Sequence, residues 1–420
     1  MISINDLILV PLYLFIIFGI ARLIKSKNIK KHPEYRYFIK GIWFKLIGVS
    51  FFIIIYLFYY KGGDTITYFK GAKALGELIL SDSEKGLAIL FNTDSYYNSY
   101  SSFNYQTGFP AHSYFSNKNT FIVCRISAIF YLLSSKSFVV TSLLTSVFSY
   151  IGIWKFYRLL NLLYPKRQKA FAYLILYMPS LIFWGGGIMK DSFMLGATCW
   201  ITSNIYYLFI AQKKMFWNGF FLILNTIMVL NCKPYILISL IPGFLFWINN
   251  YYLKSVKNKL IRILVFPAII VAFVGLGALI FNSLSDSMGV YGSLEGAIKK
   301  AQITQDDLLN EWHYGGNNYK LDRIDGSISG LVNSAPIAIF TAIFRPLPWE
   351  IGSPTMVVSA IENTVLLLFT FYSLIIIGPF KFLKIIVNDP FLIYCFIFSL
   401  FFAFGVGIAG TNFGALVRYK

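Results

Sequence analysis

Long apolar runs recur along this sequence, from Leu7 to a few residues before its end. Each run is about 17–22 residues long, enough for a helix rising about 1.5 Å per residue to cross a hydrocarbon layer of about 30 Å. The runs do not alternate apolar and polar residues, as the strands of a membrane β-barrel do. They therefore predict an all-α, polytopic membrane protein.

Composition agrees with this class. The 420 residues are 57% hydrophobic and only 13% charged, with a mean hydropathy of +0.64, whereas soluble chains carry about twice that charged fraction. The net charge of +19 lies in short connections between apolar runs, which argues against nucleic acid as a partner and favours membrane lipid or a phosphate-bearing lipid substrate. The four cysteines and three histidines are too scattered to predict a disulfide framework or a metal cluster.

The distribution of basic residues predicts the topology. Residues 22–45 carry eight basic side chains and one acid, Glu34, which is typical of a cytoplasmic connection. Following the later basic clusters gives about ten transmembrane helices. The expected spans are 7–23, 43–60, 138–157, 169–186, 192–211, a pair that turns outside at 231–234, 262–281, 357–378 and 390–409. The N-terminus lacks the features of a cleavable signal peptide.

We expect a single integral membrane domain over 1–420, with two large extracytoplasmic loops. The first, 61–137, is polar over most of its length and contains an apolar stretch at 119–134 that we expect to lie in the membrane interface. The second, 282–356, is acidic in its first part and ends in a re-entrant or interfacial segment before Arg345-Pro346. The chain stops outside, shortly after Arg418, and whether it is truncated there is left open.

With this topology, the unusual polar residues share one side of the membrane. They are Asp64, Arg125, Lys190, Asp191, Lys233, Arg345, Glu350, Glu362 and Arg418. Ionisable residues at or below the membrane edge are costly and mark candidate functional sites. A purely structural alternative exists for both leading acids, because Asp64 and Asp191 each precede an apolar stretch and are suited to cap a helix.

These residue types suit group transfer at a membrane surface. A carboxylate beside an acceptor hydroxyl takes its proton as a general base, and lysine or arginine neutralises a departing phosphate. Asp64 and Asp191 are therefore the predicted catalytic residues. The predicted substrate-binding residues are Lys190, Lys233, Arg345, Glu350 and Arg418.

Several segments resemble the GT-C superfamily of membrane glycosyltransferases, over about residues 45–215. They are Gly63-Asp64-Thr65-Ile66-Thr67-Tyr68-Phe69, Arg125-Ile126-Ser127-Ala128, Tyr164-Pro165-Lys166-Arg167, the turn from Pro179 to Asp191, and the terminal Val417-Arg418-Tyr419. The sequence departs from the family in an additional first helix, in the absence of a Trp-Trp-Asp signature, and in the absence of an acidic neighbour to Asp64, which leaves a divalent metal cofactor open.

The resemblance implies an enzyme of the bacterial inner (cytoplasmic) membrane, acting on its extracytoplasmic face. It would move a sugar from a polyprenyl-phosphate carrier to a glycan, lipid or protein acceptor, with Asp64 as the catalytic carboxylate, Lys190 and Asp191 shaping the site, and Arg345 or Arg418 on the lipid phosphate. Two alternatives remain. One is a polysaccharide polymerase or ligase of the O-antigen kind, which would depend on Arg345; the other is a non-enzymatic flippase or transporter of lipid-linked glycans.

Overall fold

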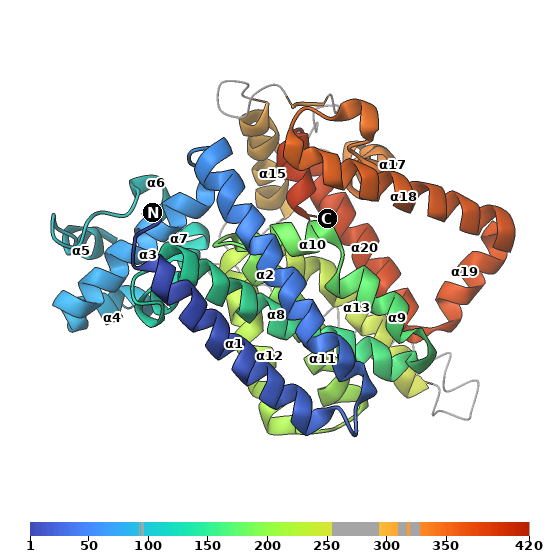
Figure 1. Cartoon of the computed structure of the whole chain (residues 1–420). Coiled ribbons are helices and arrows are strands. Elements are labelled where there is room, and N and C mark those ends of the chain that lie inside the picture. Colours follow the sequence, from blue (N-terminus) through green and yellow to red (C-terminus); the bar gives the residue numbers. More distant parts are fainter. Residues whose placement is uncertain (92, 94–95, 254–293, 310–316, 320–327, 420) are drawn as a thin grey trace. The chain divides into compact units, whose positions relative to one another are not determined.

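The computed structural model describes residues 1–91, 93, 96–253, 294–309, 317–319 and 328–419. This part of the chain is helical and contains no β-strand (Figure 1), with a single isolated bridge between Asn318 and Asn412. Seven helices in it are long and apolar enough to cross a membrane. The predicted all-α class is confirmed for the described residues, and the seven helices are compatible with a multi-pass membrane protein.

The chain forms two compact units, residues 1–207 with 213–232 and residues 208–212 with 233–420. The first unit contains α1 (Asp6–Asn28), α2 (Phe38–Ile54), α3 (Asp64–Ser81), α4 (Ser83–Phe91), α5 (Tyr96–Ser101), α6 (His112–Phe115), α7 (Lys118–Leu133), α8 (Phe138–Leu163), α9 (Gln168–Phe171), α10 (Pro179–Trp184), α11 (Lys190–Ile205) and α12 (Met215–Cys232). The second contains α13 (Pro234–Leu253), α15 (Leu294–Leu308), α17 (Ile328–Phe344), α18 (Pro354–Ile377), α19 (Pro379–Asn388), α20 (Pro390–Ala409) and α21 (Phe413–Leu416).

The core of the first unit is the pair α8 and α11, with α2 and α12 packed beside it. Glycines allow the closest approach. A Cβ added to Gly152 of α8 would clash with the backbone of Gly196 on α11, and the buried Ser149 lies beside this contact. Small residues of this kind let membrane helices pack backbone to backbone. In this core, the ammonium group of Lys155 on α8 donates hydrogen bonds to the side-chain oxygens of Asn204 and Asn218.

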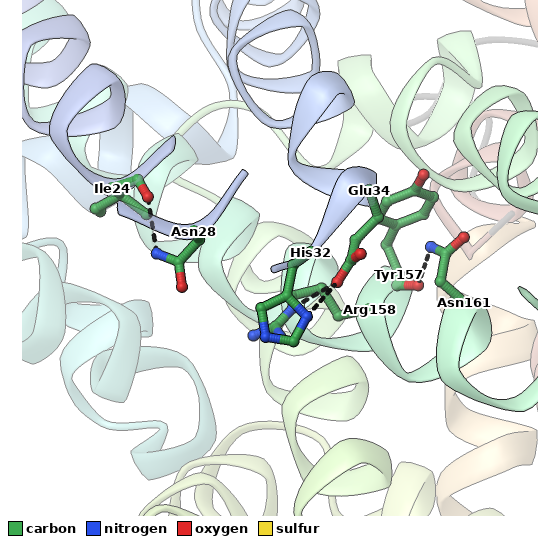
Figure 2. Close-up of polar contacts among 7 residues, drawn as sticks. All are labelled: Ile24, Asn28, His32, Glu34, Tyr157, Arg158 and Asn161. Atoms are coloured by element: carbon green, nitrogen blue, oxygen red, sulfur yellow. Dashed lines mark hydrogen bonds and ion pairs between the residues drawn. The ribbon is translucent and has the colours of Figure 1, made fainter. Parts of the chain in front are cut away.

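The connection between α1 and α2 is fixed by an ion pair that joins it to α8 (Figure 2). Glu34, the one acid of this basic segment, is buried, and its carboxylate lies 3.3 Å from Arg158 and 3.5 Å from His32. A buried carboxylate needs such partners because the loss of hydration would otherwise be uncompensated. Glu34 thus has a structural role that the charge count alone did not predict.

The predicted span over 169–186 is wrong as a continuous helix. A short α9 continues into a π-helical segment at Ala172–Leu176. The backbone is then extended at Met178, with φ −65° and ψ 119°, before α10 begins at Pro179. Proline has no amide hydrogen to donate and disfavours helical geometry in the residue before it. The segment is therefore a broken helix that packs on α2.

Other predicted segments agree with the observed helices. α18 and α20 correspond to the expected spans 357–378 and 390–409, although α19, which joins them, was not predicted. The stretches expected to be interfacial or re-entrant are helical: the first forms the 16-residue α7, packed along α3, and the second forms α17, which ends at Phe344 directly before Arg345. Their interfacial placement stays a prediction. The expected span 262–281 and the acids Asp286 and Glu311 lie outside the described residues.

Candidate functional site

The backbone at Gly62-Gly63 places Asp64 at the beginning of α3. Gly63 precedes the helix with φ +102°, a conformation that side chains with a Cβ rarely adopt. Asp64 is the first residue of the helix, and Gly63 occupies the N-cap position. The positive end of the helix dipole favours an ionised carboxylate at this position.

The Asp64 carboxylate is half-buried and oriented by a tyrosine from the following loop. The Tyr114 hydroxyl of α6 donates a hydrogen bond of 2.8 Å to Asp64 Oδ1. Tyr114 packs edge-on against Tyr68, one helical turn after Asp64, with ring centroids 5.1 Å apart. Burial raises the pKa of both phenols well above their usual range, and the charge of Asp64 adds to the shift. Both hydroxyls are therefore protonated at neutral pH.

Lys190, the first residue of α11, contacts α7. Its Nζ donates a hydrogen bond of 2.9 Å to Thr120 Oγ1. Cys124, four residues further along α7, is buried, and its thiol lies against Gly71 of α3. Because α3 and α6 pack against α7 and Lys190 donates to Thr120 of α7, the elements that carry Asp64, Tyr114 and Lys190 all contact α7.

Asp191 follows Lys190 in the first turn of α11 and is half-buried. It does not form the helix cap, since α11 already begins at Lys190 and its cap makes no side-chain hydrogen bond. The predicted meeting of Asp64 and Asp191 in one cavity remains a prediction. Within the described residues, no group of three or more His, Cys, Asp or Glu side chains is arranged to hold a metal ion.

The other predicted binding residues, Lys233, Arg345, Glu350 and Arg418, belong to the second unit. Arg345 donates to Glu350 Oε1 through Nε at 2.8 Å and through Nη2, while Glu350 Oε2 accepts from the amide of Leu347 at 2.8 Å. Both side chains are largely buried, 23% and 15% exposed. The ion pair and the hydrogen bond from the Leu347 amide thus stabilise the turn after α17.

Aromatic rings lie against two of these cations, Arg345 and Lys233. The Arg345 guanidinium lies 5.2 Å from the ring centre of Tyr319 and 5.0 Å from that of Phe413, and the two rings stack at 4.5 Å. Lys233, which is buried, lies 4.2 Å from the ring centre of Tyr419, the neighbour of Arg418. Cations over aromatic faces gain electrostatic energy without a carboxylate partner. Residues 413–419 therefore carry the rings under both Arg345 and Lys233.

Tyr68 lies within the segment from Gly63 to Phe69 that carries the resemblance, but had no predicted role. The sequence did not single out Tyr114 and Thr120 in the first unit or the stacked rings of Tyr319 and Phe413 in the second. Tyr68 had a detectable signal, because it lies four residues after Asp64 and so on the same face of a helix. Tyr114 and Thr120 reach the site only through tertiary packing, and nothing local distinguishes them. Comparison with protein-family models, with curated proteins and with solved structures finds no match for this chain.

Proposed function

We propose that this chain is a membrane glycosyltransferase that moves a sugar from a polyprenyl-phosphate carrier to an acceptor on the extracytoplasmic face, with Asp64 as general base. One observation carries the proposal. The carboxylate of Asp64 is oriented by Tyr114 at the start of α3, α3 packs against α7, and the ammonium of Lys190 donates a hydrogen bond to Thr120 of α7. A positioned carboxylate can accept a proton as a general base, and a cation can stabilise a departing phosphate.

The reaction follows from these two groups. The acceptor hydroxyl oxygen forms a bond to the anomeric carbon as the bond from that carbon to the phosphate oxygen breaks. Asp64 takes the hydroxyl proton, and the polyprenyl phosphate leaves with the bonding electron pair. Lys190 neutralises the charge that develops on the phosphate, while Tyr114 keeps the carboxylate in position through its hydrogen bond.

A finer topology belongs to the proposal. The proposed count is ten spans. It comprises the seven apolar helices, α13, the broken segment before Lys190, and the expected span 262–281, which lies outside the described residues. The basic segment around Glu34 then faces the cytoplasm of a bacterial inner membrane. Asp64 and Lys190 face the opposite side, where lipid-linked sugars are used.

The proposal is tested with Asp64→Asn, which preserves shape and removes the base. Membranes containing the full chain are supplied with a panel of polyprenyl-phosphate-linked hexoses and pentoses, and release of polyprenyl phosphate is measured. We expect a loss of about 100-fold or more, the usual contribution of general-base catalysis. Asp82→Asn is the matched control, since Asp82 lies just after the other end of α3 in a surface pair with Lys85. Full activity in Asp64→Asn would refute the assignment.

The second candidate is a polysaccharide polymerase or ligase that depends on the second unit. Its support is the concentration of cations there, with Lys233, Arg345 and Arg418 around one aromatic segment. Against it, Glu350 already neutralises Arg345. Arg345→Ala separates the two candidates: a polymerase of this kind loses activity in Arg345→Ala and tolerates Asp64→Asn, whereas the glycosyltransferase shows the larger loss in Asp64→Asn.

A further inference from the structure

A cavity lined in part by charged side chains lies on α3 away from Asp64. Its volume is about 560 Å³, and it is lined by Phe69, Lys70, Lys73, Glu77, Tyr131 and Lys136. Lys70, Lys73 and Glu77 follow one another at helical spacing, so they share one face of α3. At about 1.5 Å per residue this face lies roughly 9–20 Å along the helix from Asp64. The cavity is therefore separate from the proposed catalytic residues.

The charge of this cavity is positive and only partly compensated. Glu77 accepts hydrogen bonds from Lys136 at 2.8 Å and from Tyr131 at 2.5 Å. Although its partial burial opposes ionisation, these two bonds lower the pKa of Glu77, so it is ionised at neutral pH. Neither Lys70 nor Lys73 has a carboxylate within 4.0 Å in the described part of the chain. Three lysines and one glutamate give the cavity a net positive charge, which a phosphate group would neutralise.

An apolar groove of about 610 Å³ adjoins this cavity along the start of α1. Ile4, Leu7, Val10 and Pro11 line it, together with Val139 at the start of α8. The two spaces are neighbours, because Met1 lines the first and Ile2 the second, and because Val139 follows Lys136 by three residues. An anionic head and a hydrocarbon tail would thus be recognised side by side.

The one acid of the groove, Asp6, is already satisfied. It is buried, with Oδ1 accepting from the hydroxyl of Ser137 and Oδ2 from the amide of Ser3 at 2.7 Å. These hydrogen bonds join the start of α1 to Ser137, directly before α8. The groove extends from Ile4 to Pro11, about 10 Å along the chain at 1.5 Å per residue. One leaflet is about 15 Å thick, so the groove fits the upper part of an acyl chain and is short for a polyprenyl chain.

We propose that this two-part site binds an anionic glycerophospholipid of the surrounding membrane. The phosphate lies between Lys70, Lys73 and Lys136, and the first part of one acyl chain lies against Leu7 and Val139. The site is independent of the proposed transferase activity. It would fix the otherwise exposed start of α1 against α3 and α8 through a lipid.

Native mass spectrometry of the full chain in detergent tests the site, with phosphatidylglycerol and phosphatidylcholine of identical acyl chains as probes. We expect the wild type to prefer phosphatidylglycerol about ten-fold or more, since each lysine near a lipid phosphate contributes about five-fold. The double variant Lys70→Gln, Lys73→Gln should lose this preference. Lys85→Gln, an exposed lysine in a surface pair, is the control and should retain it. Val139→Trp, which fills the groove, should weaken both lipids.

Three outcomes would overturn the proposal. The first is equal binding of the two lipids by the wild type. The second is an unchanged preference in the lysine double variant, whose folding is verified by circular dichroism. The third is displacement of phosphatidylglycerol by inorganic phosphate or by polyprenyl phosphate at equal concentration, which would assign the cavity to a free anion or to the carrier lipid.

Discussion

The hydroxyl of Tyr114 donates a 2.8 Å hydrogen bond to the carboxylate of Asp64, 50 residues earlier in the chain. This bond joins the short helix α6 to the first residue of α3. It also determines which way the carboxylate faces, because the Tyr114 ring is itself held edge-on by Tyr68. The contact makes Asp64 a positioned group rather than a flexible surface acid.

Removing this hydrogen bond should reduce the proposed activity without abolishing it. Tyr114→Phe keeps the ring packing and loses the donor, and a hydrogen bond to a charged group contributes about 1.5–3 kcal/mol. We expect a rate reduction of about ten-fold to 100-fold at saturating donor, smaller than for Asp64→Asn. Tyr100→Phe, which removes a bond to the carbonyl of Pro110 in the same loop, is the control. Equal losses in both variants would show that Tyr114 acts only through loop stability.

The contact between α8 and α11 should be intolerant of a single methyl group. Gly152→Ala places a Cβ against the backbone of Gly196, where neither helix can yield without separating. Overpacking of this kind costs about 1–3 kcal/mol, and we expect a lower melting temperature in detergent. Gly219→Ala on α12 is matched, because nothing lies within 4 Å of the added Cβ; it should leave the melting temperature unchanged or raise it. The same melting temperature for both variants would contradict close packing at Gly152.

Much of the helical architecture could be predicted from the sequence, because a span is a local property: length and apolarity suffice for α8, α18 and α20. The broken segment before Lys190 was missed although Pro179 was visible, since uniform apolarity was given more weight than a helix breaker. For the site, the turn before Asp64 has a local signal, because Gly63 adopts a φ of +102° that favours glycine. The partners Tyr114 and Thr120 could not be predicted, because both contacts depend on how α6, α7 and α11 pack.

The ion pair between Arg345 and Glu350 should be more important for the stability of the fold than for the proposed sugar transfer. Glu350→Gln leaves the partly buried guanidinium of Arg345 without its charged partner, and an uncompensated group of this kind costs about 1–3 kcal/mol. We expect a lower melting temperature and near-normal activity per folded molecule. Arg345→Lys keeps the charge but not the two-pronged donation to Glu350, and should behave similarly. A large loss of activity at unchanged melting temperature would instead favour the polymerase candidate.

Acid should weaken the link between α3 and the turn before α8 through Glu77. Its hydrogen bonds from Lys136 and Tyr131 hold the folded pKa below the ordinary value of 4.5. Such a group stabilises the fold fully above the unfolded pKa and loses this contribution as the pH falls through the folded pKa. The difference in melting temperature between wild type and Glu77→Gln should therefore be constant from neutral pH to about pH 5.5 and shrink below 4.5. Taking the difference cancels the titration of the other carboxylates, and a difference that grew in acid would show that Glu77 is not stabilised in its ionised form.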